Sequence, residues 1–289
     1  MTTILVTGAT GTVGTQVVKA LAEKSGTQVR VGVRNASSYK GTTNDRIKAV
    51  ELDWANAESQ RAALAGVDRA FLLTPFVPNQ VEIGTSFVDL AKQAGVKHLV
   101  KLSAIGCEIE PGIQLGRWHR AIEKHVEASG LAWTFLRPNN FMENFIGYYP
   151  PQGDGNIYLP FGDGSVSWIA ARDIGEVAAV TLTESIEKHA GQAYVLTGSE
   201  ALSVKQVAAI LSSATERSIS FVDVPEEAAR KAMLDAQLPA WMVDAMMELH
   251  AIDKAGYASA VSPLVQQLTG RSPTSFADFA RQNAAAWRK

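Results

Sequence analysis

Short apolar runs alternate along the first half of the chain with longer segments whose apolar residues recur at helical spacing. The apolar runs predict strands at residues 3–6, 28–33, 46–52, 68–73, 97–102 and 131–136. The longer segments predict helices at residues 15–23, 56–65, 81–93 and 115–129. Because strands and helices alternate, the pattern predicts an α/β fold with a doubly wound parallel sheet and helices on both faces.

The regular pattern breaks after residue 136. Residues 147–167 are rich in proline, glycine and aromatic residues, which predicts a loop-rich insert with a short strand at residues 157–159. We interpret this insert as a substrate wall or lid; the alternative is an ordinary long connection. The remaining pattern predicts a strand at residues 193–196 and helices at 173–182, 204–214, from 225, at 241–249 and at 276–287.

These patterns predict two domains, and 289 residues are enough to form both. A Rossmann domain is expected over residues 1–145, with residues 166–198 returning to its sheet. A smaller, mostly helical substrate-binding lobe and lid is expected over residues 146–165 and 199–289.

Composition narrows the range of partners. The net charge is −2 and no basic run occurs, which argues against a nucleic-acid surface. Cys107 is the single cysteine, so neither an internal disulfide nor a thiolate metal cluster is expected, and we interpret Cys107 as a small core residue. No apolar run reaches the ~18 residues of a membrane span, and no leader pattern opens the sequence. We therefore expect a cytoplasmic protein with a small-molecule substrate, no bound metal and no membrane or nucleic-acid partner; a homodimer remains open.

Three glycines follow the first predicted strand and precede the first predicted helix. Gly8 permits a tight turn, Gly11 lets the backbone approach a pyrophosphate, and Gly14 lets the helix pack close to the strand. Amides at the start of a helix favour a bound phosphate. This context predicts NAD(P) binding, with the turn alone as the alternative. The residues expected to contact the cofactor here are Thr7, Gly8, Thr10, Gly11, Thr12, Val13 and Gly14.

The second predicted strand ends at Arg34, and no acidic residue follows before Asp45. An NAD site usually places a carboxylate here for the ribose 2′-hydroxyl, whereas an arginine suits a 2′-phosphate. The sequence therefore favours NADPH, with NADH left open. Arg34 as a solvated side chain is the alternative, and Lys40 or Arg46 could share the phosphate-binding role.

Other predicted strand ends supply further candidate residues, because ligands of parallel sheets bind at the carboxyl ends of strands. Asp53, with Trp54, is expected either near the adenine or as a turn residue. Ser103 is expected near the nicotinamide or, equally, as a strand-end cap. The further cofactor candidates are Leu73, Thr74, Pro75 and Asn139. The candidates for contact with a flat aromatic substrate are Phe76, Ile105, Asn140, Phe141, Tyr148 and Tyr149.

The glycine spacing that follows Thr7 resembles that of the short-chain dehydrogenases, but the catalytic pair of an ordinary member is missing. Such an enzyme carries Tyr-x-x-x-Lys on the helix after the serine, but none of the six tyrosines has a lysine four residues later. His119, on the predicted 115–129 helix, is the one titratable group placed to assist near neutral pH. The alternative is a structural imidazole. We interpret its neighbours Arg120, Glu123 and Lys124 as a solvated face.

Five segments together resemble one protein group. They are residues 7–14, 103–106, 116–123, 136–142 and 268–276. In this order they are similar to the NmrA-like atypical short-chain dehydrogenases, in particular the NAD(P)H-dependent triphenylmethane, azo and quinone reductases. The resemblance implies hydride transfer from NADPH to a conjugated aromatic acceptor without a Tyr/Lys pair. The alternative that it leaves open is an NAD(P)-binding redox sensor that regulates a partner without turnover.

Overall fold

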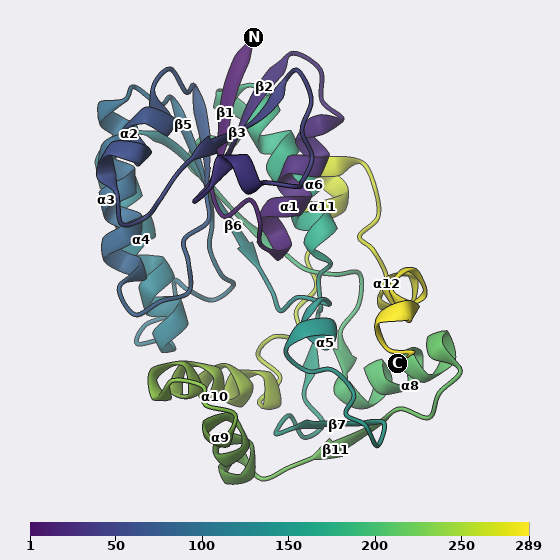
Figure 1. The fold of residues 1–289 in the computed structure, drawn as a ribbon. Coiled ribbons are helices and arrows are strands. Elements are labelled where there is room, and N and C mark those ends of the chain that lie inside the picture. The colour runs from purple at the N-terminus through teal and green to yellow at the C-terminus, as the bar shows by residue number, and fades with distance from the viewer. Residues whose placement is uncertain (289) are drawn as a thin grey trace. The chain divides into compact units, whose positions relative to one another are not determined.

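The computed structural model describes residues 1–288 and divides them into two compact units. Unit 1 contains Met1–Gly112, Gly116–Pro138 and Ala171–Val195. Unit 2 contains Ile113–Leu115, Asn139–Ala170 and the residues from 196 onward. Figure 1 shows the elements of each unit in sequence colours.

Unit 1 is built on a doubly wound sheet. Its strands are β1 (Thr2–Val6), β2 (Thr27–Val33), β3 (Ile47–Glu51), β4 (Arg69–Leu72), β5 (His98–Leu102) and β6 (Ala132–Pro138), joined by β9 (Gln192–Leu196). The strand order is β3-β2-β1-β4-β5-β6-β9. The pairs from β3 to β6 are parallel; Val6, for example, lies opposite Val31 on one side and Phe71 on the other. This order confirms the predicted Rossmann-like α/β fold.

Helices cover both faces of this sheet (Figure 1). One face carries α1 (Thr12–Ala22) and α6 (Ala171–Thr183). These two helices pack so closely that a Cβ at Gly175 would lie 2.7 Å from the Gln16 backbone. The other face carries α2 (Ala57–Leu64), α3 (Gln80–Gln93) and α4 (Gln114–Ser129). Apolar residues of these three helices, such as Phe87 and Ile122, bury against β-strand residues such as Phe135 in one core cluster. The short 3-10 helix Ala36–Ser38 and α7 (Ile186–His189) complete the unit.

Unit 2 contains several short strands and helices. The segment predicted as a loop-rich insert, residues 147–167, forms β7 (Asn156–Leu159) and β8 (Ser165–Val166), and α5 (Asn144–Gly147) ends at its first residue. β7 pairs in parallel with β11 (Ser220–Asp223), and β8 pairs antiparallel with β10 (Leu202–Ser203). The helices are α8 (Val204–Thr215), α9 (Glu226–Asp235), α10 (Ala240–Lys254), α11 (Leu264–Thr269) and α12 (Phe276–Gln282).

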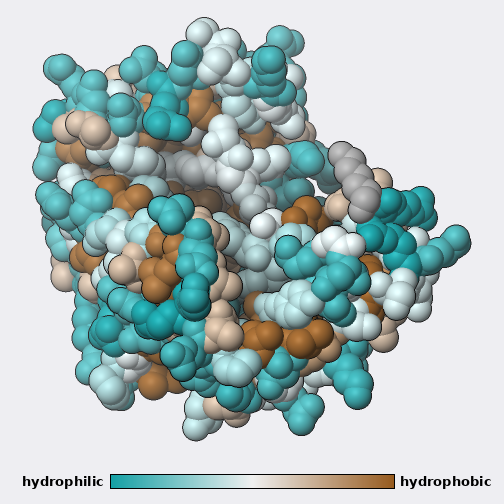
Figure 2. Space-filling view, turned by 60° about the horizontal axis from the view of Figure 1, so that its bottom comes forward, coloured by the Kyte–Doolittle hydropathy of each residue, from teal (hydrophilic) through white to brown (hydrophobic). Residues whose placement is uncertain are grey.

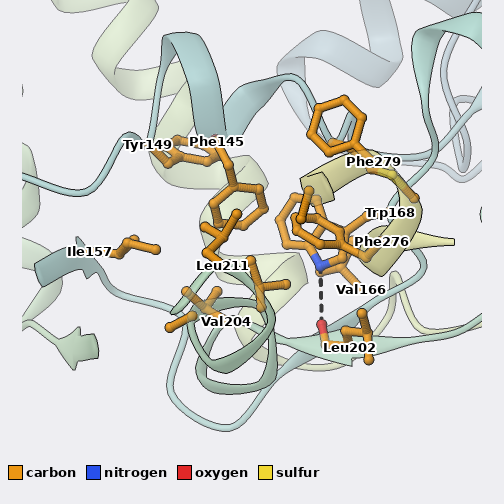
Figure 3. Close-up of a cluster of buried hydrophobic side chains, with 14 of the residues drawn as sticks. Phe145, Tyr149, Ile157, Val166, Trp168, Leu202, Val204, Leu211, Phe276 and Phe279 are labelled. Carbon is orange, nitrogen blue, oxygen red and sulfur yellow. Dashed lines mark hydrogen bonds between the residues drawn. The ribbon is translucent and has the colours of Figure 1, made fainter. Parts of the chain in front are cut away.

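An aromatic core holds unit 2 together (Figure 3). The ring of Phe145 packs edge-on against Trp168 and Phe276, with centroids 4.9 and 5.4 Å away. The buried indole of Trp168 donates to the Leu202 carbonyl at 3.1 Å, shown as the dashed line in Figure 3. The same core buries five residues of the insert, so the insert is packed rather than a bare loop; they are Tyr149, Ile157, Leu159, Phe161 and Val166.

The predicted element bounds agree with the structure to within a few residues over unit 1. In unit 2, a capping box of Ser203 and Gln206 begins α8. The last helix differs: predicted to run to residue 287, it ends at Gln282 and a 3-10 helix follows at Ala284–Ala286. Six short elements were not predicted because their patterns are too short to show a period: α5, α7, α11, β8, β10 and β11.

The surface drawn in Figure 2 mixes hydrophilic residues with small hydrophobic groups. The large apolar side chains that are exposed are Met1, Ile109, Ile146, Tyr148, Tyr158, Leu234, Tyr257 and Val261. Within residues 1–288, none of the helices is long and apolar enough to cross a membrane.

Candidate active site

The glycine turn between β1 and α1 has the close backbone contacts that its three glycines suggest. Gly8 has a φ of +61°, a region that side chains disfavour. A Cβ added at Gly14 would lie 2.1 Å from the Gly8 carbonyl oxygen, so helix and turn touch through bare backbone. A Cβ at Gly11 would meet only that same oxygen, at 3.3 Å. Gly14 is therefore required by packing, whereas the exposed Gly11 leaves one side of the turn open.

The start of α1 fits a bound phosphate. Gly11 is the N-cap, no side chain caps the helix, and its first turn contains no acidic residue. Thr10, Gly11 and Thr12 are exposed, while Val13 and Gly14 are buried. An uncapped, exposed helix start offers backbone amides and a favourable dipole to an anion. The turn thus satisfies the requirements of the pyrophosphate of a dinucleotide.

Thr7 connects the ends of two central strands. Its buried hydroxyl accepts a hydrogen bond from the Leu73 amide at 2.8 Å and lies 3.1 Å from the Phe71 carbonyl oxygen. A Cβ at Gly8 would lie 2.8 Å from the Leu73 side chain. The predicted cofactor residues Thr7, Gly8 and Leu73 are therefore brought together, and Thr74 is buried next to them in sequence.

The end of β2 presents a cation without a partner. Arg34 is exposed, and no hydrogen bond or ion pair within residues 1–288 engages its guanidinium. Arg46, by contrast, donates to the carbonyls of Lys24 and Ala22 at 2.7 and 3.0 Å, which fixes it to the end of α1. Of the three cations considered for a 2′-phosphate, Arg34 and the exposed Lys40 remain available.

The segment after β3 is a turn with one carboxylate oxygen in use. Asp53 Oδ1 accepts from the Ala55 amide at 3.0 Å, which is the turn role anticipated for it. Its partly buried neighbour Trp54 packs edge-on against Phe87, with ring centroids 5.5 Å apart. An adenine contact by either residue stays a prediction.

Ser103 and Cys107 lie beyond β5 as a buried pair. The Ser103 hydroxyl is 3.5 Å from Cys107 Sγ, and that thiol donates to Glu123 Oε1 at 3.3 Å. Burial raises the pKa of the Cys107 thiol to about 11. The thiol therefore stays protonated at neutral pH, as expected of a core cysteine rather than a nucleophile.

Lys101 is a residue that the sequence analysis missed. It lies on β5, its side chain is fully buried, and its ammonium Nζ donates to the Leu102 carbonyl and to His119 Nδ1, each at 3.0 Å. Burial lowers the pKa of Lys101 to about 8, although Glu123 and Cys107 oppose that change. The sequence does contain a signal for this residue: a lysine stands within the strand 98–102, which is expected to be covered on both faces. Such positions are almost never charged.

His119 receives this hydrogen bond on the partly buried face of α4. Removal from water and the Lys101 charge hold its pKa well below the usual 6.5, so the ring is neutral at neutral pH. An ammonium has no acceptor, so Nδ1 must be the unprotonated nitrogen and Nε2 must carry the proton. Within residues 1–288 this is the only hydrogen bond that the imidazole makes, so Nε2–H is available as a donor.

The prediction that Glu123 lies on a solvated face of α4 is wrong. This carboxylate is fully buried and accepts hydrogen bonds from Arg137 Nε and Nη2 at 3.0 and 2.7 Å and from Arg120 Nη1 at 3.0 Å. Burial is the largest influence and would raise the pKa of Glu123, but the hydrogen bonds from Arg137 and Ser103 and the charges of Arg137 and Lys101 together lower it. The buried ion pair fixes α4 to β6, the neighbour of β5. Lys124 does lie at the surface, paired with Glu110.

The remaining residues of unit 1 considered for the acceptor lie at strand ends. Phe76 packs against Trp118 of α4 with ring centroids 6.1 Å apart, and the preceding Pro75 is partly buried. The amide of Ile105 donates to the Pro138 carbonyl at 3.0 Å. Phe76 is therefore held against α4, the helix that carries His119, and Ile105 is held against the end of β6.

The other predicted contact residues belong to unit 2. Asn139 is buried and donates to the Ser167 hydroxyl and the Ala258 carbonyl, both at 2.7 Å. Asn140 donates to Asp253 Oδ1 at 3.0 Å. Burial raises the pKa of Asp253 to about 8, so this carboxyl is largely protonated at neutral pH.

The aromatic residues of unit 2 differ in exposure. Tyr148 is 75% exposed, whereas Tyr149 is buried and its hydroxyl lies 3.3 Å from His250 Nε2. Phe141 is partly buried and forms an isolated bridge with Ile169. Substrate contacts by these residues stay a prediction.

Comparison with known proteins identifies the family. The model of the NmrA-like family matches residues 1–278, so the chain belongs to that family and the resemblance inferred from the sequence is confirmed. It is 40% identical over 285 residues to an NAD(P)H azoreductase of Xenophilus azovorans, covering 98% of this chain and 99% of that protein.

Two solved structures share the fold over nearly their whole length. The triphenylmethane reductase of Citrobacter sp. complexed with NADP(H) has a TM-score of 0.85 and 26% identity, over 98% of this chain and 100% of that one. The NADPH-dependent quinone oxidoreductase QOR2 of Escherichia coli complexed with NADPH has a TM-score of 0.86 and 25% identity, over 96% and 99%.

Proposed function

We propose that this protein is an NAD(P)H-dependent reductase that transfers hydride to a conjugated aromatic acceptor, such as a quinone, azo compound or triphenylmethane dye. The observation that carries the proposal is the phosphate-ready turn at Gly8–Gly14 in a chain related over its whole length to such reductases. The three kinds of acceptor share an electron-poor conjugated centre that accepts hydride readily.

NADPH is the proposed preferred cofactor. Arg34 is exposed and unpaired within the described chain at the end of β2, where the 2′-substituent of the adenosine ribose is recognised in Rossmann folds. A guanidinium there can hold a phosphate with two parallel hydrogen bonds. When bound, the dihydronicotinamide supplies the hydride.

The residues of α4 take the place of a Tyr-x-x-x-Lys pair in this proposal. His119 is neutral and presents its Nε2–H as a donor, so it can hydrogen-bond an acceptor oxygen or nitrogen without itself being charged. Ser103, which directly follows β5, is the second proposed group, and its buried hydroxyl lies 3.5 Å from Cys107 Sγ. These two side chains are the proposed catalytic groups.

A turnover assay with purified protein tests the proposal. NADPH and NADH oxidation are followed with menadione, an azo dye and a triphenylmethane dye, and cofactor binding is measured separately by titration. We expect turnover of at least one acceptor, with NADPH preferred. The Gly11→Val variant is the matched control, since its side chain would fill the open side of the turn with little effect on the fold.

One outcome distinguishes the alternative. A redox sensor would bind the cofactor and turn over none of the acceptors. That result would reject the reductase and favour the regulatory role.

A further inference from the structure

We propose that Lys101 is the proton reservoir of this site and supplies its proton to the reduced acceptor through His119. The inference rests on the proposed reductase function. It assigns a role to a fully buried lysine on β5, a strand position that otherwise favours apolar side chains.

The geometry supports a relay in one direction. Lys101 Nζ donates to His119 Nδ1 at 3.0 Å, so the lysine proton already points at the imidazole. Because Nδ1 is the acceptor, the imidazole carries its own proton on Nε2, the nitrogen on the far side of the ring. A proton accepted on Nδ1 can thus be matched by a proton released from Nε2.

The step balances as follows. A quinone that has taken up a hydride is an anion and needs one proton to become the hydroquinone. The Nε2–H bond of His119 breaks as the new O–H bond forms, and Nδ1 takes a proton from Lys101 Nζ. This leaves a neutral amine and a neutral imidazole protonated on Nδ1. Solvent then returns one proton to Nε2, and the Nδ1 proton moves back to Lys101.

The surroundings of Lys101 make its proton available at neutral pH. The groups that face it are His119 and Glu123 of α4, Cys107 beyond β5 and Arg137 of β6. Burial outweighs the attraction of Glu123 and brings the pKa of Lys101 to about 8. A phenolate-type oxygen with a pKa near 10 would therefore take this proton with about a hundredfold equilibrium advantage.

The charge of the acceptor provides an internal control. A cationic triphenylmethane dye becomes neutral when it receives a hydride, so its reduction needs no proton. A quinone does need one. The ratio of the menadione rate to the dye rate therefore reports on proton supply, while changes in cofactor binding or in the folded fraction cancel.

The test compares Lys101→Met with Lys97→Met. Lys97 precedes β5 and is 67% exposed in its side chain, so the control removes the same charge from the surface. We expect Lys101→Met to lower the menadione-to-dye ratio by on the order of tenfold to a hundredfold, and Lys97→Met to leave it near the wild-type value. The wild-type menadione kcat should fall above pH 8 and that limb should vanish in Lys101→Met. An unchanged ratio in Lys101→Met would overturn the relay.

A second measurement needs no turnover. Nitrogen-15 NMR of the His119 ring in the cofactor-free protein should show the Nε2–H tautomer in the wild type and in Lys97→Met, and a mixture of tautomers in Lys101→Met. If the wild type shows a mixture, the Lys101–His119 bond does not set the tautomer and the inference fails, whatever the acceptor assay gives. If the tautomer is as expected but no acceptor is reduced, the proposed function fails and the assigned proton transfer fails with it.

Discussion

Replacement of Lys101 by methionine should change the pH dependence of stability in a way that follows from its burial. Methionine has a similar length and no charge, so it removes the ammonium from the centre of the sheet while filling most of its space. The lysine is fully buried and its pKa is about 8, against 10.5 for a free lysine. At about 1.4 kcal/mol for each tenfold change, this difference corresponds to about 3 kcal/mol.

The sign follows from proton binding. Below pH 8 the ammonium is charged in both the folded and the unfolded chain, and the folded chain carries the full cost of burying it. Between pH 8 and 10.5 the folded protein has released the proton while the unfolded chain still holds it. Stability therefore rises with pH in this window because the unfolded state binds more protons.

Equilibrium urea unfolding of the wild type, Lys101→Met and Lys97→Met is the assay. The variant-minus-wild-type difference in the free energy of unfolding removes the contribution of titrating groups that do not interact with Lys101. For Lys101→Met, this difference should become less favourable to the variant by about 3 kcal/mol from neutral pH to pH 10.5. Lys97→Met, which removes a lysine from the surface, controls for the loss of a side-chain charge as such. A constant difference for Lys101→Met would show that its pKa is ordinary and would refute the reasoning.

Three further predictions concern the turn, the cofactor and the ion pair. Gly14→Ala should lower the free energy of unfolding by about 1–3 kcal/mol, because its Cβ would lie 2.1 Å from the Gly8 oxygen. Gly11→Ala should change the free energy of unfolding by less than about 0.5 kcal/mol and yet weaken NADPH binding. Equal stability losses in the two variants would contradict this. Arg34→Ala should weaken NADPH more than NADH in a binding titration, and equal weakening would remove its phosphate role. Glu123→Gln should cost about 3–5 kcal/mol in urea unfolding, since the guanidinium of its partner on β6 loses its buried carboxylate; a loss below about 1 kcal/mol would count against this buried pair.

The turn could be located from the sequence because its chemistry is local. Three glycines between an apolar run and a helical stripe specify a strand, a turn and a helix within a few residues of each other. The unpaired cation at the end of β2 was found in the same way, since strand order in this fold places that end next to the ribose. The structure then distinguished the two candidates for the 2′-phosphate, because Arg46 donates to backbone carbonyls at the end of α1, whereas Arg34 does not.

The ionisable cluster could not be found in this way, because its members come from three segments. Glu123 of α4 was interpreted as solvated because its helical neighbours are charged. In the structure it forms a buried ion pair with Arg137 of β6. Lys101 was passed over because its run was interpreted only as a strand, and its partner His119 lies eighteen positions later.

The sequence by itself determined the alternating pattern, and with it the parallel sheet, the glycine turn and the absence of a Tyr-x-x-x-Lys pair. Tertiary structure decided which charges are buried and which nitrogen of His119 carries a proton. The reason is physical: hydrophobic periodicity is set by neighbours along the chain, whereas a pKa and a tautomer are set by the charges and the amount of water within a few ångströms in space.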